Sequence, residues 1–413
     1  MKYKRYTCRY GIIMFVMGLL AVQFFVVSSL RQATVANCRR MGFPVLSIMT
    51  EKNKPIKQKE KYIKAEYNLD GLEGTCRIRG HGNSTWKSRL TSKKPYLLNL
   101  DEEQSLCGMN ASRKWILMAN ACDRSMLRNY YAEYLSHNVW NSMKWNPSSK
   151  YIFLFLNGKF MGLYGLTEKI EIEPGRMNFE GDGFIAEVDS HDGRPYTFTT
   201  ERKGKRVHIR RPADQTVEQY KKYEETINEI ERTVWRLAVN TNLSFPSNFD
   251  KDSFVDWYLL SEFSQNYDSD FFNSVYMNYD YGTGIFSMGP LWDHDIAFGN
   301  THHESARNPH NLYISKAPWF TIFLANKDFR KSVNERWKEK RPALEESIEW
   351  LKERGAEIND AAELTDTVWH ILGSPNWPRT PGWKERKTHQ SEIDYLVGWV
   401  EERMKYLDSV YGI

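Results

Sequence analysis

Residues 151–166 read Tyr-Ile-Phe-Leu-Phe-Leu-Asn-Gly-Lys-Phe-Met-Gly-Leu-Tyr-Gly-Leu and carry the clearest structural signal in the chain. Two apolar runs flank Asn157-Gly158, and tight two-residue turns prefer Asn-Gly because both positions need positive φ. The stretch therefore predicts a β-hairpin. Upstream, the alternating residues at 74–79 and the apolar run at 94–100 predict two further strands.

Beyond a break at 174–183, punctuated by Pro and Gly, the pattern becomes mostly helical. Amphipathic stretches predict helices at 215–240, 251–265, 328–355 and 390–410, and two short runs predict a β-ribbon at 275–278 and 285–287. A further helical stretch is expected to open at Asp123. We therefore predict an α+β fold, with a β-rich small lobe over 65–173 and a helical large lobe over 174–413.

The amino terminus carries a secretory pattern. Residues 1–10 hold four basic side chains and no acid, and an apolar run follows from Gly11 to Val27. The run is long for a cleavable signal core and slightly short for a span of about 20 residues. We predict a signal anchor over 1–36, or alternatively a cleaved signal peptide, with the body exported to the periplasm or cell surface. The Lys-rich residues 37–64 are expected to form a tether or an exposed edge segment.

Composition bounds the function. Of the 413 residues, 41% are hydrophobic and 26% charged, which is typical of a soluble globular body, and basic residues exceed acidic ones by only five. Such a small surplus does not call for a nucleic-acid partner. The five cysteines include no Cys-x-x-Cys pair, so a zinc ribbon is unsupported. The four that follow the apolar run are expected to form up to two disulfides or to be buried thiols.

Acidic and amide side chains concentrate in two segments, residues 266–273 and 292–299. Asp268 is followed five positions later by Asn273, and a second acidic motif, Asp293-His294-Asp295, runs on to Phe-Gly. This order has the form of a kinase catalytic loop and its metal motif. Carboxylate and amide oxygens are hard ligands suited to Mg²⁺ or Mn²⁺. The ordinary alternative is turn and cap chemistry.

A glycine-containing turn in the first half could supply the groups that bind phosphate. Residues 79–86 read Arg-Gly-His-Gly-Asn-Ser-Thr-Trp, and such a turn can bring backbone N–H groups near an anion. Lys93 and Lys94 follow at the start of the next predicted strand. A simple hairpin turn would explain the glycines equally well, but the order of turn, lysine, helix, hairpin and acidic loop favours a phosphate site.

Five motifs in this order resemble the CotH kinase family, the spore-coat CotH proteins and their exported bacterial relatives. They lie at residues 79–86, 93–96, 117–129, 156–168 and 292–299, and the resemblance runs from about residue 45 to 300. It implies an atypical protein-kinase-like fold of two lobes. It also implies binding of ATP with a divalent metal, Mg²⁺ or Mn²⁺, and phosphorylation of Ser or Thr in secreted proteins.

The resemblance carries specific roles onto this chain. Asp268 would be the catalytic Asp and Asn273 a metal ligand, with Asp293 or Asp295 as the second metal carboxylate; the sequence does not choose between these two, although Asp293 is preferred. The expected nucleotide-binding residues are Arg79 and Lys94 as phosphate contacts, Asn83 and Ser84 in the turn above the phosphates, and Glu168 at the start of the hinge. A strand-end charge paired with a neighbour is the alternative for Glu168.

The chain also departs from ordinary kinases. It has no His-Arg-Asp triplet before the loop and no Gly-x-Gly-x-x-Gly motif. Asp123 and Glu133 are both candidates for the acid that pairs with the strand lysine, and their spacing does not decide between them.

Two other function classes remain open at this stage. The Asp-x-Asp of 293–295 also suits a metal-dependent glycosyltransferase or, with His302, His303, Glu304 and His310, a hydrolase that uses Mn²⁺ or Zn²⁺. A non-catalytic surface scaffold that binds polysaccharide or a coat protein would fit the aromatic content of 14%. Against the scaffold, the acidic set is intact, and Trp115, Trp140, Trp257 and Trp292 occupy core-like positions.

Overall fold

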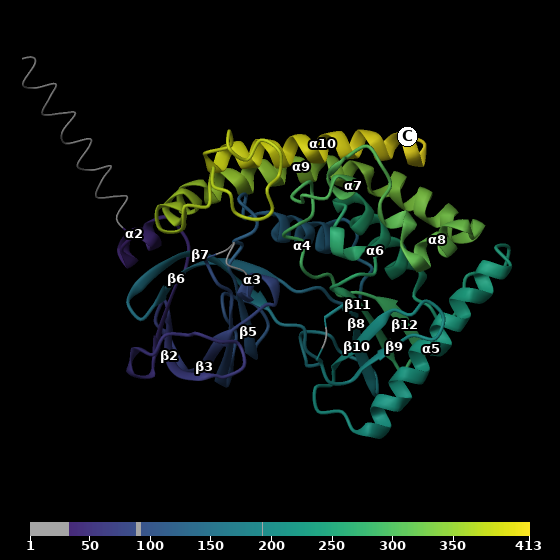
Figure 1. The fold of residues 1–413 in the computed structure, drawn as a ribbon, viewed down its shortest axis with the longest axis horizontal. Helices are drawn as coiled ribbons and strands as arrows, with labels where there is room; N and C mark the ends of the chain where they lie inside the picture. The colour runs from purple at the N-terminus through teal and green to yellow at the C-terminus, as the bar shows by residue number, and fades with distance from the viewer. Residues whose placement is uncertain (1–32, 88–91, 192) are drawn as a thin grey trace, which may run out of the picture.

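The computed structural model describes residues 33–87, 92–191 and 193–413 (Figure 1). Helices and strands are both abundant, which confirms the predicted α+β class. The predicted signal anchor or signal peptide over 1–36 lies outside these ranges except for its last four residues. Within the described ranges, no helix combines the length and apolar character that a membrane crossing needs.

Seven strands close into a barrel at one end of the molecule (Figure 1). Their order around the barrel is β1-β2-β3-β4-β5-β7-β6, and β6 closes it by pairing with β1 in parallel. Alternate side chains such as Ile78, Leu98 and Trp115 are fully buried and fill the interior. The strands are β1 Val45–Thr50, β2 Ile63–Leu69, β3 Leu72–Gly80, β4 Tyr96–Gln104, β5 Ser112–Met118, β6 Ser149–Leu156 and β7 Lys159–Glu168.

The predicted hairpin is formed by β6 and β7. Asn157 and Gly158 have φ values of 50° and 74°, the left-handed pair that a tight hairpin turn needs. The Asn157 side chain also accepts a hydrogen bond of 2.8 Å from the backbone N of Thr50. The turn therefore both sets the hairpin register and holds the end of β1 against it.

The segment 37–64 differs from its prediction as a tether or edge. It contains α2 Val35–Arg40 in part and all of β1, which is paired on one side with β2 and on the other with β6. Only residues 51–62 are largely exposed, as an edge segment would be. The prediction is wrong for Val45–Thr50 because β1 is a short run whose closing partner lies far along the chain, so local pattern gives little signal.

A second sheet of five strands lies in the half predicted to be mostly helical. Its order is β12-β11-β8-β10-β9, formed by β8 Gly183–Val188, β9 Thr197–Thr199, β10 Arg206–Arg211, β11 Val275–Asp280 and β12 Ile285–Met288. The ribbon of β11 and β12 confirms the prediction at 275–278 and 285–287. The sequence analysis did not predict β8 to β10. In β10, Val207 and Ile209 do alternate with polar residues, but two apolar positions are a weak signal, and β9 has only three residues.

The four predicted long helices are present, and one is longer than expected. The helices of eight or more residues in the described ranges are α4 Arg128–Asn138, α5 Val217–Val239, α6 Lys251–Ser264, α8 Pro318–Ala325, α9 Lys327–Trp369 and α10 His389–Tyr411. The predicted end of α9 near residue 355 is wrong. Gly355 is a packing position in its interior, where a Cβ would lie 2.8 Å from the Ile393 side chain of α10.

Helix α9 connects the barrel to the helical part, and α10 runs beside it (Figure 1). Near its end, the Thr365 hydroxyl accepts a hydrogen bond of 2.8 Å from the backbone N of Leu163 in β7. The Trp369 indole donates to the Met161 carbonyl at 2.8 Å. At its other end α9 packs on α6 and α8. One continuous helix therefore contacts both the barrel and the helical part of the molecule.

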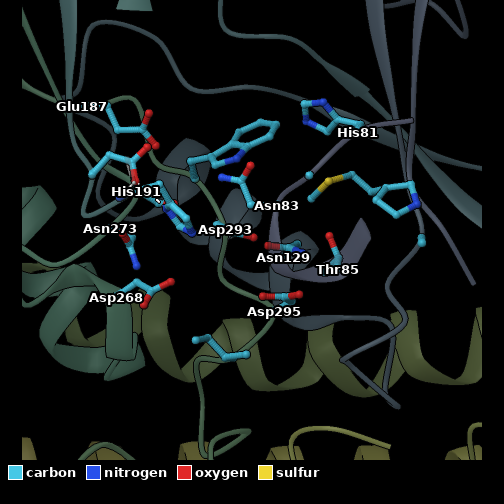
Figure 2. A pocket seen from close by; sticks show the side chains of 18 of the residues that line it. His81, Asn83, Thr85, Asn129, Glu187, His191, Asp268, Asn273, Asp293 and Asp295 are labelled. Atoms are coloured by element: carbon cyan, nitrogen blue, oxygen red, sulfur yellow. Dashed lines mark hydrogen bonds and ion pairs between the residues drawn. The ribbon is translucent and has the colours of Figure 1, made fainter. Parts of the chain in front are cut away.

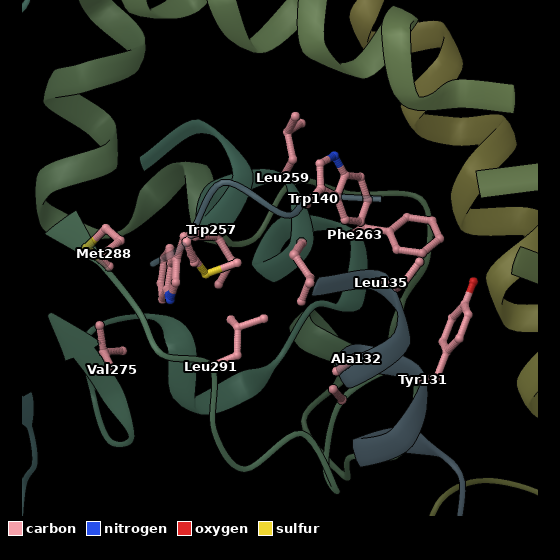
Figure 3. Close-up of a cluster of buried hydrophobic side chains, with 14 of the residues drawn as sticks. Tyr131, Ala132, Leu135, Trp140, Trp257, Leu259, Phe263, Val275, Met288 and Leu291 are labelled. Carbon is pink, nitrogen blue, oxygen red and sulfur yellow. The ribbon is translucent and has the colours of Figure 1, made fainter. Parts of the chain in front are cut away.

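The main core lies where α4 and α6 meet the second sheet (Figure 3). Trp140 and Trp257 are buried there, and Trp115 is buried in the barrel, as predicted. Trp292 is half-buried and lines a cleft instead. The four cysteines in the described ranges, Cys38, Cys76, Cys107 and Cys122, are free thiols. The structure therefore supports free thiols over disulfides for these residues.

Lys93, which the sequence analysis placed beside Lys94 near the expected phosphate site, is buried. Its ammonium donates to the carbonyl of Leu163 and lies 4.3 Å from the centre of the Tyr164 ring. Burial lowers its pKa to about 7, whereas an exposed lysine keeps its proton to about pH 10.4. The folded state therefore binds fewer protons than the unfolded state between these values, and stability must rise with pH there.

We expect Lys93→Met to remove this pH dependence. Between pH 7 and 10, set by the folded pKa of about 7 and the ordinary value of about 10.4, the wild-type protein should gain unfolding free energy relative to the variant. Urea denaturation across this range measures the difference. Lys331→Met, at an exposed position of α9, should keep the wild-type profile. If the unfolding free energy of Lys93→Met changed with pH in parallel with that of the wild type, Lys93 would not be the source of the pH dependence.

Candidate active site

A cleft of about 610 Å³ opens between the barrel and the second sheet. The barrel contributes the turn after β3 and the end of β5, and the sheet contributes β8, β10 and β11. Further lining residues come from the segment before β11, namely Tyr267, Asp268, Asn273 and Ser274, and from the segment after β12, namely Trp292, Asp293, Asp295 and Ile296. Figure 2 shows Asp268 and Asn273 beside each other, with Asp293 and Asp295 next to them and His81 across the space.

The four residues predicted for catalysis and metal binding all line this cleft. Desolvation, followed by the Asp293 charge, raises the pKa of Asp268 to about 7. Desolvation, followed by the Glu187 charge, raises the pKa of Asp293 to about 6. Desolvation and then Asp293 raise the pKa of Asp295 well above its usual value. The carboxylates therefore repel one another, and a bound cation would relieve that repulsion.

Three amide side chains, of which those of Asn266 and Asn300 are buried, hold the backbone of the 293–295 segment. Asn129 accepts a hydrogen bond of 2.7 Å from the backbone N of His294. Asn266 donates to the Asp293 carbonyl at 3.1 Å, and Asn300 donates to the Asp295 carbonyl at 2.6 Å. Asp293 itself has φ 65°, a conformation that costs a non-glycine residue free energy. The surrounding amides stabilise this turn and so fix where both carboxylates lie.

Beneath this segment lies a fully buried ion pair between Asp123 and Arg128. The Arg128 guanidinium also donates to the carbonyls of Ala297 and Phe298, at 3.1 and 3.4 Å. Asp123 accepts from the backbone N of Arg128 at 2.8 Å, which explains why the helix begins at Arg128 and not at Asp123 as predicted. The pair therefore links the start of α4 to the segment that carries Asp293 and Asp295.

Asp123 and Glu133, the two acids considered as partners for the strand lysine, interact with other groups. Asp123 pairs with Arg128, and Glu133 accepts a hydrogen bond of 2.8 Å from the backbone N of Ser149. Desolvation raises the pKa of Glu133 to about 8. A half-buried acid with that pKa is mainly neutral at pH 7, so Glu133 is poorly suited to hold a lysine by charge.

The turn after β3 brings cations to the cleft. Gly82 has φ 79°, which explains the glycine at this position. Arg79 and Asn83 line the cleft as predicted, and Lys59 joins them by donating to the Gly82 carbonyl at 3.0 Å and to Asn83 Oδ1 at 2.6 Å. Ser84 begins the short helix α3 Ser84–Lys87, and its side chain is outside the described set.

Lys94 and Glu168, predicted as nucleotide contacts, are not among the residues that line the cleft. The Lys94 ammonium donates to the Thr85 carbonyl at 3.0 Å and so supports the turn from behind. Glu168 is buried at the end of β7, where it accepts a hydrogen bond of 3.0 Å from the backbone N of Ser148. Both side chains contact backbone groups outside the cleft lining, Lys94 from the segment just before β4 and Glu168 from the end of β7.

The sheet side of the cleft carries charged residues that the sequence analysis missed. Glu187 pairs with Arg194 at 3.0 Å and with Arg210 at 3.3 Å, and Asp189 pairs with Arg194. The only available signal was an acidic pair, Glu187 and Asp189, at the end of the apolar run 183–188. Since β8 and β10 were not predicted, nothing in the pattern placed these residues near Asp268.

The donor set fits Mg²⁺ or Mn²⁺, which prefer carboxylate and amide oxygens. Within the described ranges, no three His, Cys, Asp or Glu side chains converge closely enough to cage a metal. Mg²⁺ commonly takes one or two carboxylates and completes its shell with phosphate and water. Asn273 Oδ1 accepts hydrogen bonds from the N and Oγ of Ser190, at 2.9 and 2.7 Å, so metal binding through it requires these contacts to open.

The histidines of the hydrolase hypothesis are dispersed. His303 lines the cleft, whereas His302 is exposed and His310 contacts Glu402 at 3.2 Å. They do not gather around Asp293 and Asp295, so the structure offers no support for a histidine-rich metal centre there.

Comparison with known proteins identifies the relatives of this fold and cleft. A family model described as CotH kinase protein matches residues 77–407. The matched range includes Asp268, Asn273, Asp293 and Asp295. A search of curated proteins found no match.

Proposed function

Since this chain belongs to the CotH kinase family, we propose that it is an ATP-dependent kinase that phosphorylates Ser or Thr side chains of a protein substrate. The observation that carries the proposal is the convergence of Asp268, Asn273, Asp293 and Asp295 in one cleft, opposite the cations of the turn after β3. A divalent metal, when bound, supplies positive charge that stabilises the transferring phosphoryl group.

The cations Arg79 and Lys59 are suited to bind the phosphates of ATP, because both line the cleft at the glycine-containing turn. Asp268 is suited to orient the acceptor hydroxyl and take its proton, because its carboxylate lines the cleft beside Asn273. The acceptor oxygen then bonds to the γ-phosphorus as the bond from that phosphorus to the β–γ bridging oxygen breaks. Asn129, Asn266 and Asn300 keep the carboxylates in place and need no reorganisation during the reaction.

Export of the protein stays a prediction from residues 1–36. The glycosyltransferase and scaffold hypotheses differ from the kinase proposal in their ligand, because neither requires ATP. Binding of nucleotide with metal is therefore the property to measure first.

We expect ATP with Mg²⁺ to raise the melting temperature of the protein, and neither component alone to do so to the same extent. Saturation at about 100 Kd would add about 2.7 kcal/mol of unfolding free energy. Asp293→Asn and Asp295→Asn should weaken or abolish this gain, and the variant with the larger loss identifies the principal metal carboxylate. Because each variant removes a repelled charge, its melting temperature without ligand should not fall.

Asp328→Asn provides the matched control, since Asp328 is an exposed acid on α9 that pairs with Lys251. It should respond to ATP and Mg²⁺ as the wild type does. If the folded wild-type protein shows no stabilisation by ATP with Mg²⁺ or Mn²⁺, the kinase proposal fails and the scaffold hypothesis gains support.

A further inference from the structure

One end of the cleft is aromatic. Tyr267, which directly precedes Asp268, stacks on His303 with ring centroids 3.9 Å apart and an angle of 2° between the planes. His302 continues the series at 3.9 Å from His303, and Trp377 lies 6.0 Å from His302. Tyr267, His303 and Trp377 line the same cleft as Asp268. We call these four rings the aromatic ladder.

Two arginines outside the cleft lining, Arg124 and Arg307, hold the ladder in position. Arg124, which is 2% exposed, donates to the carbonyls of Ser374, Asn376 and Pro378, at 2.9, 2.6 and 3.1 Å. These carbonyls lie on both sides of Trp377, so one guanidinium fixes the connection between α9 and α10 at the point where it reaches the cleft. Arg307 similarly donates to the His302 carbonyl at 3.1 Å.

Charge divides the cleft into two ends. His81 is surrounded by cations: desolvation and then Arg79, Arg210, Lys59 and Arg194 lower its pKa to about 3. The pKa of His303 is lowered by desolvation and by its neighbour His302. A polyanionic triphosphate is attracted to the end around His81. The ladder adjoins Asp268 at the other end of the cleft, where it is available to the acceptor.

We propose that the aromatic ladder is the acceptor-binding wall, and that it selects acceptor segments carrying an aromatic side chain next to the Ser or Thr hydroxyl. The inference rests on the proposed kinase function and deepens it by naming the substrate class. Aromatic rings that meet edge-to-face or offset contribute about 0.5–1.5 kcal/mol beyond their buried area. An aromatic neighbour therefore improves binding by about 2- to 12-fold over alanine.

The test uses two short fluorescein-labelled peptides that differ only in having Phe or Ala beside a single Ser. Anisotropy titrations with the full-length protein measure binding, and phosphate transfer from ATP measures turnover of the same peptides. Wild type should prefer the Phe peptide by about 2- to 12-fold. Trp377→Ala should abolish most of this preference, and Trp377→Phe, which keeps a ring, should retain part of it.

Trp383→Ala is the matched control, because Trp383 lies on the same connection, contacts Lys384 and does not line the cleft. It should bind both peptides as wild type does. Stabilisation by ATP with Mg²⁺ should survive Trp377→Ala, which separates failure of this inference from failure of the kinase proposal. Equal binding of the two peptides, binding of neither, an unchanged preference in Trp377→Ala, or selective binding of an oligosaccharide in place of the peptides would each overturn the acceptor assignment.

Discussion

Asp268→Asn is expected to reduce phosphate transfer from ATP by about 10²–10⁴-fold, the usual contribution of a positioned acid or base. Asn keeps the size of the side chain but cannot take the proton of the acceptor hydroxyl. Asp268 is half-buried in the cleft, and Asn273 hydrogen-bonds to it. Because the substitution removes a charge that Asp293 repels, the protein should fold at least as stably as wild type.

The measurement is phosphate incorporation into Ser- and Thr-containing peptides and into the protein itself, with nucleotide binding followed in parallel by thermal shift. Binding of ATP with Mg²⁺ should persist in Asp268→Asn, because the proposed mechanism assigns Asp268 to the hydroxyl and the other carboxylates to the metal. Asp270→Asn is the matched control: it lies two residues further along the same loop, outside the cleft lining. Equal losses in both variants, or wild-type rates in Asp268→Asn, would remove Asp268 from the reaction.

Local pattern predicted the parts of the fold that local physics determines. The hairpin at 149–168 follows from the two positive φ values that Asn157-Gly158 accommodates. The helices follow from apolar periodicity. The predicted helix 328–355 ended too early, at Gly355, which in the structure permits close packing on α10. Closure of the barrel was not predictable in this way, because β1 and β6 come from distant parts of the chain.

The residues of the candidate site also differ in whether local sequence pattern could predict them. Asp268, Asn273, Asp293 and Asp295 were identified because the chemistry of phosphoryl transfer constrains their type and spacing. Lys94 was chosen over Lys93 without any way of knowing which face of the chain each would take, and neither lines the cleft. The ion pairs of Glu187 lie in a sheet that the pattern did not reveal. Where tertiary pairing decides orientation, one sequence carries too little information.

Arg128→Met is expected to destabilise the protein by about 3–5 kcal/mol, the usual cost of leaving one partner of a buried ion pair alone. Arg128 and Asp123 are both fully buried and contact each other directly. The variant leaves the Asp123 carboxylate without its cation and the carbonyls of Ala297 and Phe298 without their donor. Urea denaturation measures the free energy of unfolding.

The double variant Asp123→Asn with Arg128→Met should recover part of this loss, because it also removes the uncompensated charge. Arg354→Met, at a surface pair with Glu357, should cost less than about 1 kcal/mol. The same substitution tests whether the pair also serves the site. Arg128 holds the backbone just beyond Asp295, so folded Arg128→Met protein should gain less stability from ATP with Mg²⁺ than Arg354→Met does. If Arg128→Met and Arg354→Met prove equally stable and equally responsive to nucleotide, the ion pair of Asp123 and Arg128 neither supports the fold nor positions the 293–295 segment.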